Sequence, residues 1–186
     1  MNLERWASAV SLEDFIERAR TSQELWRGIH SRARVPDGLV RRAMALPPTR
    51  LLVLLEDWCG DAVNTIPPLA RLVEAVPGLE LRVLSRDDNP GLMDSHLRGT
   101  ARAIPVVIPL DEAFRETGWW GSRPAELQAW VRSPAARAMP KDERYRHVRG
   151  WSARDRGRTA LSEIVGCWSA APPDPAPASG VDRGWG

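Results

Sequence analysis

The chain has 186 residues, 43% of them apolar, and a formal net charge of +2, which fits one globular domain and leaves too little length for two. No run of eighteen apolar residues occurs, which excludes a membrane-spanning helix. The two cysteines are too few for a disulfide framework, and no metal-ligand spacing such as C-x-x-C is present, so we expect no metal site. Residues 1–11 lack the basic start and apolar stretch of a secretory signal, and we therefore expect a cytoplasmic protein.

The first 48 residues predict three short amphipathic helices that cover a core formed later in the chain. Ser11 can cap the first helix, with Asp14 at its third position. The third helix begins at Asp37 and ends before Pro47. We assign residues 1–48 to an N-terminal helical extension packed on the core. The apolar faces of its helices are Leu12, Phe15, Ile16 and Ala19, then Leu25, Trp26, Ile29 and Ala33, then Leu39, Val40, Ala43 and Met44.

Strands and helices alternate between residues 49 and 132, which we assign to the central domain. An unbroken apolar run at residues 51–55 predicts a strand buried on both faces. The order β-α-β-α-β-β-α predicts an α/β fold with a mixed four-stranded sheet flanked by helices. The later elements are helix 61–75, strand 79–85, helix 90–97, strand 104–110, its antiparallel partner 113–117, and a helix that Ser122 caps with Pro124 in its first turn.

The last part of the chain is basic. Between Arg132 and Arg158, nine Lys and Arg residues stand against three Asp and Glu residues. We interpret residues 133–170 as a solvated, arginine-rich connector followed by a C-terminal helix; a surface for an acidic partner or nucleic acid is the alternative. Residues 171–186 are rich in Pro, Ala and Gly and predict a disordered tail. The apolar face of the C-terminal helix is Leu161, Ile164, Val165 and Trp168.

Cys59 is the main candidate for chemistry, because it stands between the central strand and the helix that follows it. At such a position the backbone N–H groups and the helix dipole favour the thiolate, the reactive form of cysteine, and lower the pKa of the thiol. Trp58 would shield one face of the sulfur. Asp61, in the first helical turn, opposes a negative charge on the sulfur and reduces this effect.

Three spaced features of residues 50–131 resemble the thioredoxin superfamily. Trp58-Cys59-Gly60 stands where that family has its W-C-G-x-C redox motif, and Pro67 coincides with the proline that kinks the active-site helix. Ile104-Pro105 matches the cis-proline loop that lies against the reactive sulfur and presents backbone to substrate. The string E-D-W-C-G-D is similar to that of a bacterial thioredoxin-like subfamily. The resemblance implies a thioredoxin-like fold, a catalytic Cys59, and substrate-binding roles for Trp58, Gly60, Ile104 and Pro105.

The chain departs from the family pattern at two positions. Ala62 replaces the second cysteine, which in a dithiol enzyme attacks the mixed disulfide and releases the product. Val53 occupies the place of the usual buried acid, so the ordinary proton relay to the second thiol is missing as well. Glu56 and Asp57 are the remaining candidates for a proton acceptor.

Three roles are open for Cys59. In the first, it works as a monothiol, and an external low-molecular-weight thiol such as glutathione reduces its mixed disulfide. In the second, Cys167 resolves that mixed disulfide. In the third, Cys59 is a relic in a domain kept for binding or structure. We favour a monothiol thiol–disulfide oxidoreductase that acts on protein or small-molecule disulfides, with no bound cofactor and no membrane or nucleic-acid partner. The alternatives are a non-catalytic module that binds an extended peptide along the cis-proline groove, and an adaptor built on the basic segment.

Further side chains outside the motif are weaker candidates for a role at the site. Arg86 and Arg102 are candidates to favour a thiolate or an anionic thiol. Trp119 or Trp120 is a candidate to line a substrate groove. We expect His96 at the surface and Cys167 beside the packed face of the C-terminal helix.

Overall fold

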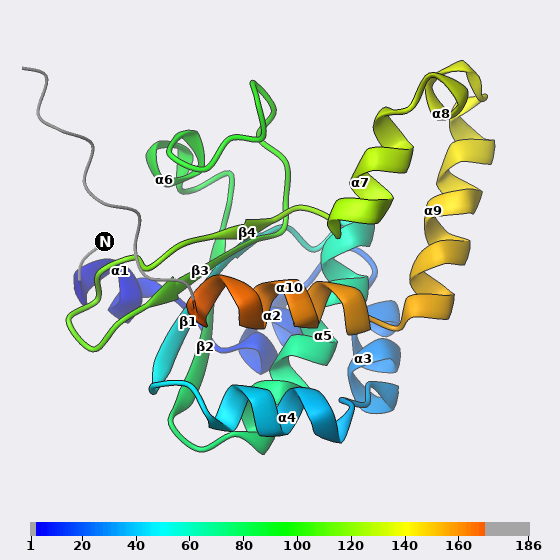
Figure 1. Cartoon of the computed structure of the whole chain (residues 1–186). Coiled ribbons are helices and arrows are strands. Elements are labelled where there is room, and N and C mark those ends of the chain that lie inside the picture. Colours follow the sequence, from blue (N-terminus) through cyan, green and yellow to red (C-terminus); the bar gives the residue numbers. More distant parts are fainter. Residues whose placement is uncertain (1–2, 170–186) are drawn as a thin grey trace, which may run out of the picture.

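Strand β1 (Thr49–Leu55) forms the centre of a four-stranded sheet of order β2-β1-β3-β4 (Figure 1). The computed structural model describes residues 3–169. β2 (Leu79–Ser85) pairs with β1 in parallel, whereas β3 (Val106–Leu110) is antiparallel to β1, and β4 (Trp120–Gly121) is antiparallel to β3. The expected mixed four-stranded sheet is confirmed. Residues 51–55 are fully buried, as an apolar run covered on both faces should be.

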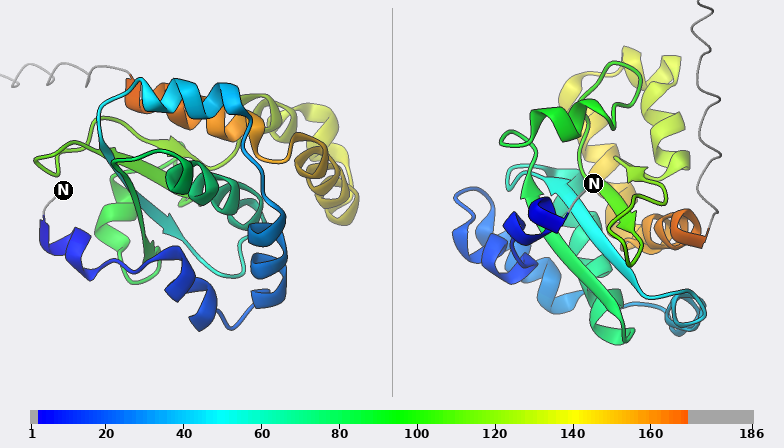
Figure 2. Two further views of the ribbon diagram at one scale, coloured as in Figure 1. Left: turned by 90° about the horizontal axis from the view of Figure 1, so that it is seen from below. Right: turned by 90° about the vertical axis from the view of Figure 1, so that its left-hand side faces the viewer.

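Helices cover both faces of this sheet. In the left view of Figure 2, α4, α5 and α10 lie on one side of the sheet, and α1, α2 and α6 lie on the other. Among the described residues, no helix is long and apolar enough to cross a membrane. The helices are α1 (Leu3–Ser8), α2 (Leu12–Arg18), α3 (Gln23–Arg32), α4 (Asp37–Met44), α5 (Gly60–Ala75), α6 (Pro90–Asp94), α7 (Ala125–Arg132), α8 (Pro134–Ala138), α9 (Lys141–Asp155) and α10 (Arg158–Ser169).

The N-terminal helices pack on the core through buried side chains that include Leu12, Ile16 and Trp26. Ser11 caps α2 and accepts a hydrogen bond of 3.0 Å from the N–H of Asp14. Val10 forms an antiparallel bridge with Val83, so the extension also adds to the outer edge of β2. Helix α1 was not predicted, because its six residues are too few to show a periodicity. Leu25 was expected to face the core, but its side chain is 48% exposed.

The fourth strand lies later in the chain than expected. Residues 113–117 were predicted to form it, but they make only one bridge to β3, between Leu110 and Glu116. The carboxylate of Asp111 accepts the N–H groups of Ala113 and Arg115 at 2.9 and 2.8 Å, which folds this segment into a turn. Glu116 and Thr117 then pair with β3 only through that bridge and one backbone hydrogen bond, from the N–H of Thr117 to the carbonyl of Pro109 at 3.0 Å, and the regular ladder forms at Trp120–Gly121.

Helix α7 begins differently from the prediction. Ser122 is buried and does not cap it; the residue preceding the helix is Pro124. The N–H of Ala125 instead donates to a carboxylate oxygen of Glu163 on α10, at 2.9 Å. Since Glu163 lies far along the chain, a capping partner of this kind leaves no local sequence signal.

The segment between Arg132 and Arg158 was expected to be a connector, but it is mostly helical. Helices α7, α8 and α9 form an arm that projects from the sheet (Figure 1). The ring of Trp130 on α7 stacks on that of His147 on α9, with 3.7 Å between their centroids. Helix α10 packs as predicted, with Leu161, Ile164, Val165 and Trp168 all buried. The predicted disorder of residues 171–186 falls outside the described residues.

Candidate active site at Cys59

Cys59 lies at the junction of β1 and α5, where it is the N-cap residue of the helix. Its Sγ donates a hydrogen bond to the carbonyl oxygen of Ile104 at 3.5 Å. The Ile104–Pro105 peptide bond that follows is cis, as expected. The fold thus brings Cys59 against the Ile104-Pro105 loop, although 44 residues separate Cys59 from Ile104 in the chain.

The surroundings of Cys59 raise the pKa of its thiol, contrary to the lowering expected from the helix N-terminus. Burial is the largest cause, because the residue is only 8% exposed and a thiolate there would lose its hydration. The N–H of Ala62 opposes this effect, the carboxylate of Asp61 adds to it, and the N–H of Asp61 and the guanidinium of Arg123 oppose it. The N–H groups of the first helical turn do favour the thiolate, but desolvation outweighs them.

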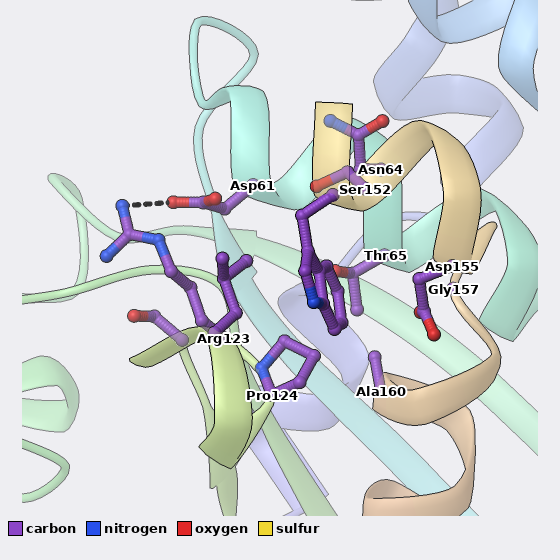
Figure 3. A pocket seen from close by; sticks show the side chains of 12 residues that line it. Asp61, Asn64, Thr65, Arg123, Pro124, Ser152, Asp155, Gly157 and Ala160 are labelled. Atoms are coloured by element: carbon purple, nitrogen blue, oxygen red, sulfur yellow. Dashed lines mark ion pairs between the residues drawn. The ribbon is translucent and has the colours of Figure 1, made fainter. Parts of the chain in front are cut away.

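Asp61 and Arg123 form an ion pair beside the sulfur, at 2.6 Å, with both side chains largely buried (Figure 3). Burial raises the pKa of the Asp61 carboxyl, and Arg123 limits that rise through its charge and hydrogen bond. Sequence reasoning missed Arg123, because it follows β4 and has no neighbouring motif. The pair places one negative and one positive group near the thiol: Asp61 raises the pKa of Cys59 and Arg123 lowers it.

Replacing Asp61 with asparagine should lower the pKa of Cys59. The change removes a negative charge that disfavours the thiolate and leaves the positive charge of Arg123 uncompensated, and both effects act in the same direction. The rate of iodoacetamide alkylation, measured against pH, should therefore show a midpoint lower than that of the parent protein.

Arg123→Gln is the matched control for this experiment, because it removes the opposite charge of the same ion pair. It should raise the thiol pKa and slow alkylation at a fixed pH near 8. Equal midpoints for both variants and the parent protein would show that the ion pair does not act on the sulfur.

Trp58 and Gly60 leave the neighbourhood of the sulfur partly open. The indole of Trp58 is 52% exposed, and a Cβ added at Gly60 would meet open space. The guanidinium of Arg86 lies over the indole, 5.1 Å from a ring centroid. The charge of Arg86 is balanced by Asp87 and that of Arg102 by Asp94, each at 2.7 Å. Because both charges are paired, these two arginines contribute little net positive charge to the site.

Comparison with solved structures supports the fold. A protein of unknown function from Pseudomonas aeruginosa is 21% identical, with a TM-score of 0.71 over 90% of this chain and 96% of its own. An HIV epitope-scaffold is 19% identical, with a TM-score of 0.69 over 92% of this chain and 99% of its own. No curated protein matches the chain. A family model described as Thioredoxin matches residues 9–142. The chain belongs to the thioredoxin family.

In this thioredoxin-family protein Glu56 and Asp57, considered above as proton acceptors, instead accept hydrogen bonds from neighbouring loops. Glu56 accepts hydrogen bonds from the hydroxyl of Ser85 and the N–H of Asp87, at 3.0 and 2.9 Å. Asp57 accepts the N–H groups of Arg20 and Thr21, at 2.7 and 2.9 Å. Of the acids near the motif, Asp61 is therefore the one whose charge acts on the thiol of Cys59.

Cys167 and Cys59 are both free thiols. The Sγ of Cys167 lies 3.7 Å from the carbonyl oxygen of Trp119. The start of α10, at Ala160, borders the same small cavity as Asp61 (Figure 3). Cys167 lies seven residues further along the helix, a rise of about 10 Å, so α10 carries it away from that cavity.

The two tryptophans and the histidine considered above all have packing roles. Trp120 is buried, and its indole donates to Glu163 at 2.7 Å. Trp119 makes an edge contact with His96, with 5.6 Å between centroids. His96 was expected at the surface, but it is buried, and its two ring nitrogens contact the Leu92 carbonyl and the Glu116 carboxylate at 2.8 and 2.9 Å. Burial lowers the pKa of His96, but the bonds to Glu116 and Leu92 outweigh it and raise this pKa.

One group of side chains in the described residues has the spacing of metal ligands. The ligand atoms of Glu13, His30 and Glu74 lie within 4.8 Å of one another. Glu74 is already paired with Arg71 at 2.6 Å, and both glutamates are exposed. Glu74 stands in the last turn of α5, whereas Cys59 caps the first turn, so the length of the helix separates this cluster from the thiol.

Proposed function

We propose that the protein is a monothiol thiol–disulfide oxidoreductase of the bacterial subfamily that carries E-D-W-C-G-D, with Cys59 as its nucleophile. The observation that carries this proposal is the position of the Cys59 sulfur at a helix N-terminus, 3.5 Å from the carbonyl of Ile104, which precedes the cis-proline. The exposed backbone and indole at Gly60 and Trp58 provide an approach to that sulfur. The proposed substrates are protein or small-molecule disulfides, in a reducing cytoplasmic setting.

The reaction consists of two exchanges. The thiolate of Cys59 attacks one sulfur of a substrate disulfide, a Cys59–substrate disulfide forms, and the other substrate sulfur leaves as a thiolate that takes up a proton. An external thiol such as glutathione, as its thiolate, then attacks the mixed disulfide. It forms a disulfide with the substrate sulfur and releases Cys59. The external thiol is needed because Ala62, buried in the first turn of α5, has no sulfur to perform this step.

A second candidate is a non-catalytic module that binds an extended peptide along the Ile104-Pro105 loop. The low exposure of Cys59 and the raised pKa of its thiol favour this function, because both reduce the amount of accessible thiolate at neutral pH. The two candidates differ in whether the sulfur is required.

A glutathione-coupled disulfide reduction assay distinguishes the two. We expect Cys59→Ser to abolish turnover, and Cys167→Ser, which removes the other thiol, to retain it. In the parent protein, turnover should rise as the pH increases above neutrality, because a raised thiol pKa leaves little thiolate at pH 7. Equal rates for the parent protein and Cys59→Ser would reject the oxidoreductase and leave the binding module.

A further inference from the structure

Five arginines surround a hollow between α3 and the junction of α9 with α10. Two adjoining depressions, of about 610 and 620 Å³, share Arg34, Ala153 and Arg156 and together form this arginine hollow. Each of the two volumes falls in the range that holds a ligand rather than a single ion. The five arginines that line it are Arg32, Arg34, Arg154, Arg156 and Arg158.

Among residues 3–169 no ion pair balances the charge of the arginine hollow, although Glu126 and Asp155 share a neighbouring depression with Arg154 and Arg158. No Asp or Glu lines either depression, and among residues 3–169 no carboxylate lies within 4.0 Å of any of the five guanidinium groups. The hydrogen bonds of Arg34 and Arg158 go to backbone carbonyls, which leave their charges in place. By contrast, Arg27 and Arg71 nearby are both paired with glutamates. The hollow is therefore a local positive potential that favours an anionic occupant.

The two depressions are also lined by aliphatic side chains, which together we call the floor of the hollow. Leu25 is 48% exposed, and Ile29 lies one helical turn further along α3. Ala33, Val35 and Pro68 extend this surface. No aromatic side chain lines the hollow, so it has no platform on which a nucleic-acid base would stack. Aliphatic side chains and guanidinium groups that line the same hollow fit a chain that carries carboxylates and aliphatic side chains together.

We infer that the arginine hollow binds an acidic, aliphatic peptide segment of a partner protein. The carboxylates of the segment pair with the five arginines, and its apolar side chains lie on Leu25 and Ile29. The hollow also borders α5 through Asn64 and Pro68, and the side chain of Asn64 donates to the carbonyl of Gly60 at 2.7 Å. A bound segment therefore lies about two helical turns from Cys59, but its binding does not require the thiol.

A fluorescein-labelled peptide in which glutamate and leucine alternate is the probe, with fluorescence anisotropy as the readout. Binding should weaken as salt is added, because exposed charges are screened. The Arg34→Glu/Arg156→Glu variant should bind at least tenfold more weakly. Arg137→Glu/Arg146→Glu makes the same charge change on α8 and α9 outside the hollow, and it should stay within about twofold of the parent protein. Cys59→Ser should bind as the parent does, which separates this test from that of the oxidoreductase.

Three outcomes would overturn the inference. They are equal binding of a peptide with lysine in place of glutamate, unchanged binding by the hollow variant, and binding of labelled oligothymidylate without binding of the acidic peptide. Thermal unfolding of each variant checks that it is folded. Should the double variant fail to fold, Leu25→Asp changes an exposed side chain of the floor without removing an arginine, and it should also weaken binding several-fold.

Discussion

Replacing Ala62 with cysteine should convert the protein from a monothiol into a dithiol. Residues 59 and 62 stand at the first turn of α5, and positions three apart on a helix bring their Cα atoms within the range that a disulfide spans. The new thiol can then attack a mixed disulfide on Cys59 from within the molecule. Because an intramolecular step replaces a bimolecular one, we expect the pre-reduced variant to release reduced substrate at least tenfold faster in a single turnover. The disulfide then left between residues 59 and 62 is reduced by external thiol in a separate step.

Ala62→Ser is the matched control, since it adds an atom of similar position without sulfur chemistry. Ala62 is fully buried, so both variants add an atom to a packed site. Thermal unfolding should show a similar, small loss of stability for the two. Under oxidising conditions Ala62→Cys should lose two titratable thiols. Retention of all three thiols would show that Cys59 and position 62 are not placed for exchange.

The elements that the sequence predicted well are those with a continuous local signal. The run at residues 51–55 became the buried centre of the sheet, and the helical spacing from Leu161 to Trp168 became the packed face of α10. The strand predicted at residues 113–117 was wrong because the Asp111 carboxylate closes a turn there. Such side-chain bonds to backbone compete with strand pairing and do not alter the pattern of apolar residues.

Some features of the candidate site were likewise predicted from the sequence, and others depend on the assembled fold. The resemblance led to Cys59 and Pro105, and the structure brings the two segments together. The pKa direction was not predictable, because it depends on how far the assembled fold, including the Ile104 loop against the sulfur, removes water from the thiol. Arg123 was missed for a related reason: a pair between Asp61 and a residue after β4 exists only once the sheet is assembled.

Trp26 should control both the stability of the protein and the exposure of Cys59. Its indole is fully buried and donates to the carbonyl of Asp57 at 2.9 Å, which fixes the loop that carries Trp58 and Cys59. Phe15 packs edge-on against it, with 5.4 Å between centroids. Trp26→Ala should lower the free energy of unfolding by about 3–5 kcal/mol, because it removes a large buried side chain. Trp26→Phe keeps most of the ring but leaves the Asp57 carbonyl without its donor, at a cost of about 1–3 kcal/mol.

Trp26→Phe is the informative variant, because it loosens the loop while the protein remains folded. Alkylation of Cys59 should accelerate, since low exposure limits access to the sulfur and raises the pKa of its thiol. Phe15→Leu provides the control: it disturbs the same cluster but leaves the bond between Trp26 and Asp57 intact. Urea unfolding gives the loss of stability of each variant, so that the alkylation rates are compared at matched stability. Faster alkylation of Cys59 in Trp26→Phe than in Phe15→Leu would then assign the increase to the loosened loop. Equal rates would mean that general destabilisation, rather than this hydrogen bond, governs access to the thiol.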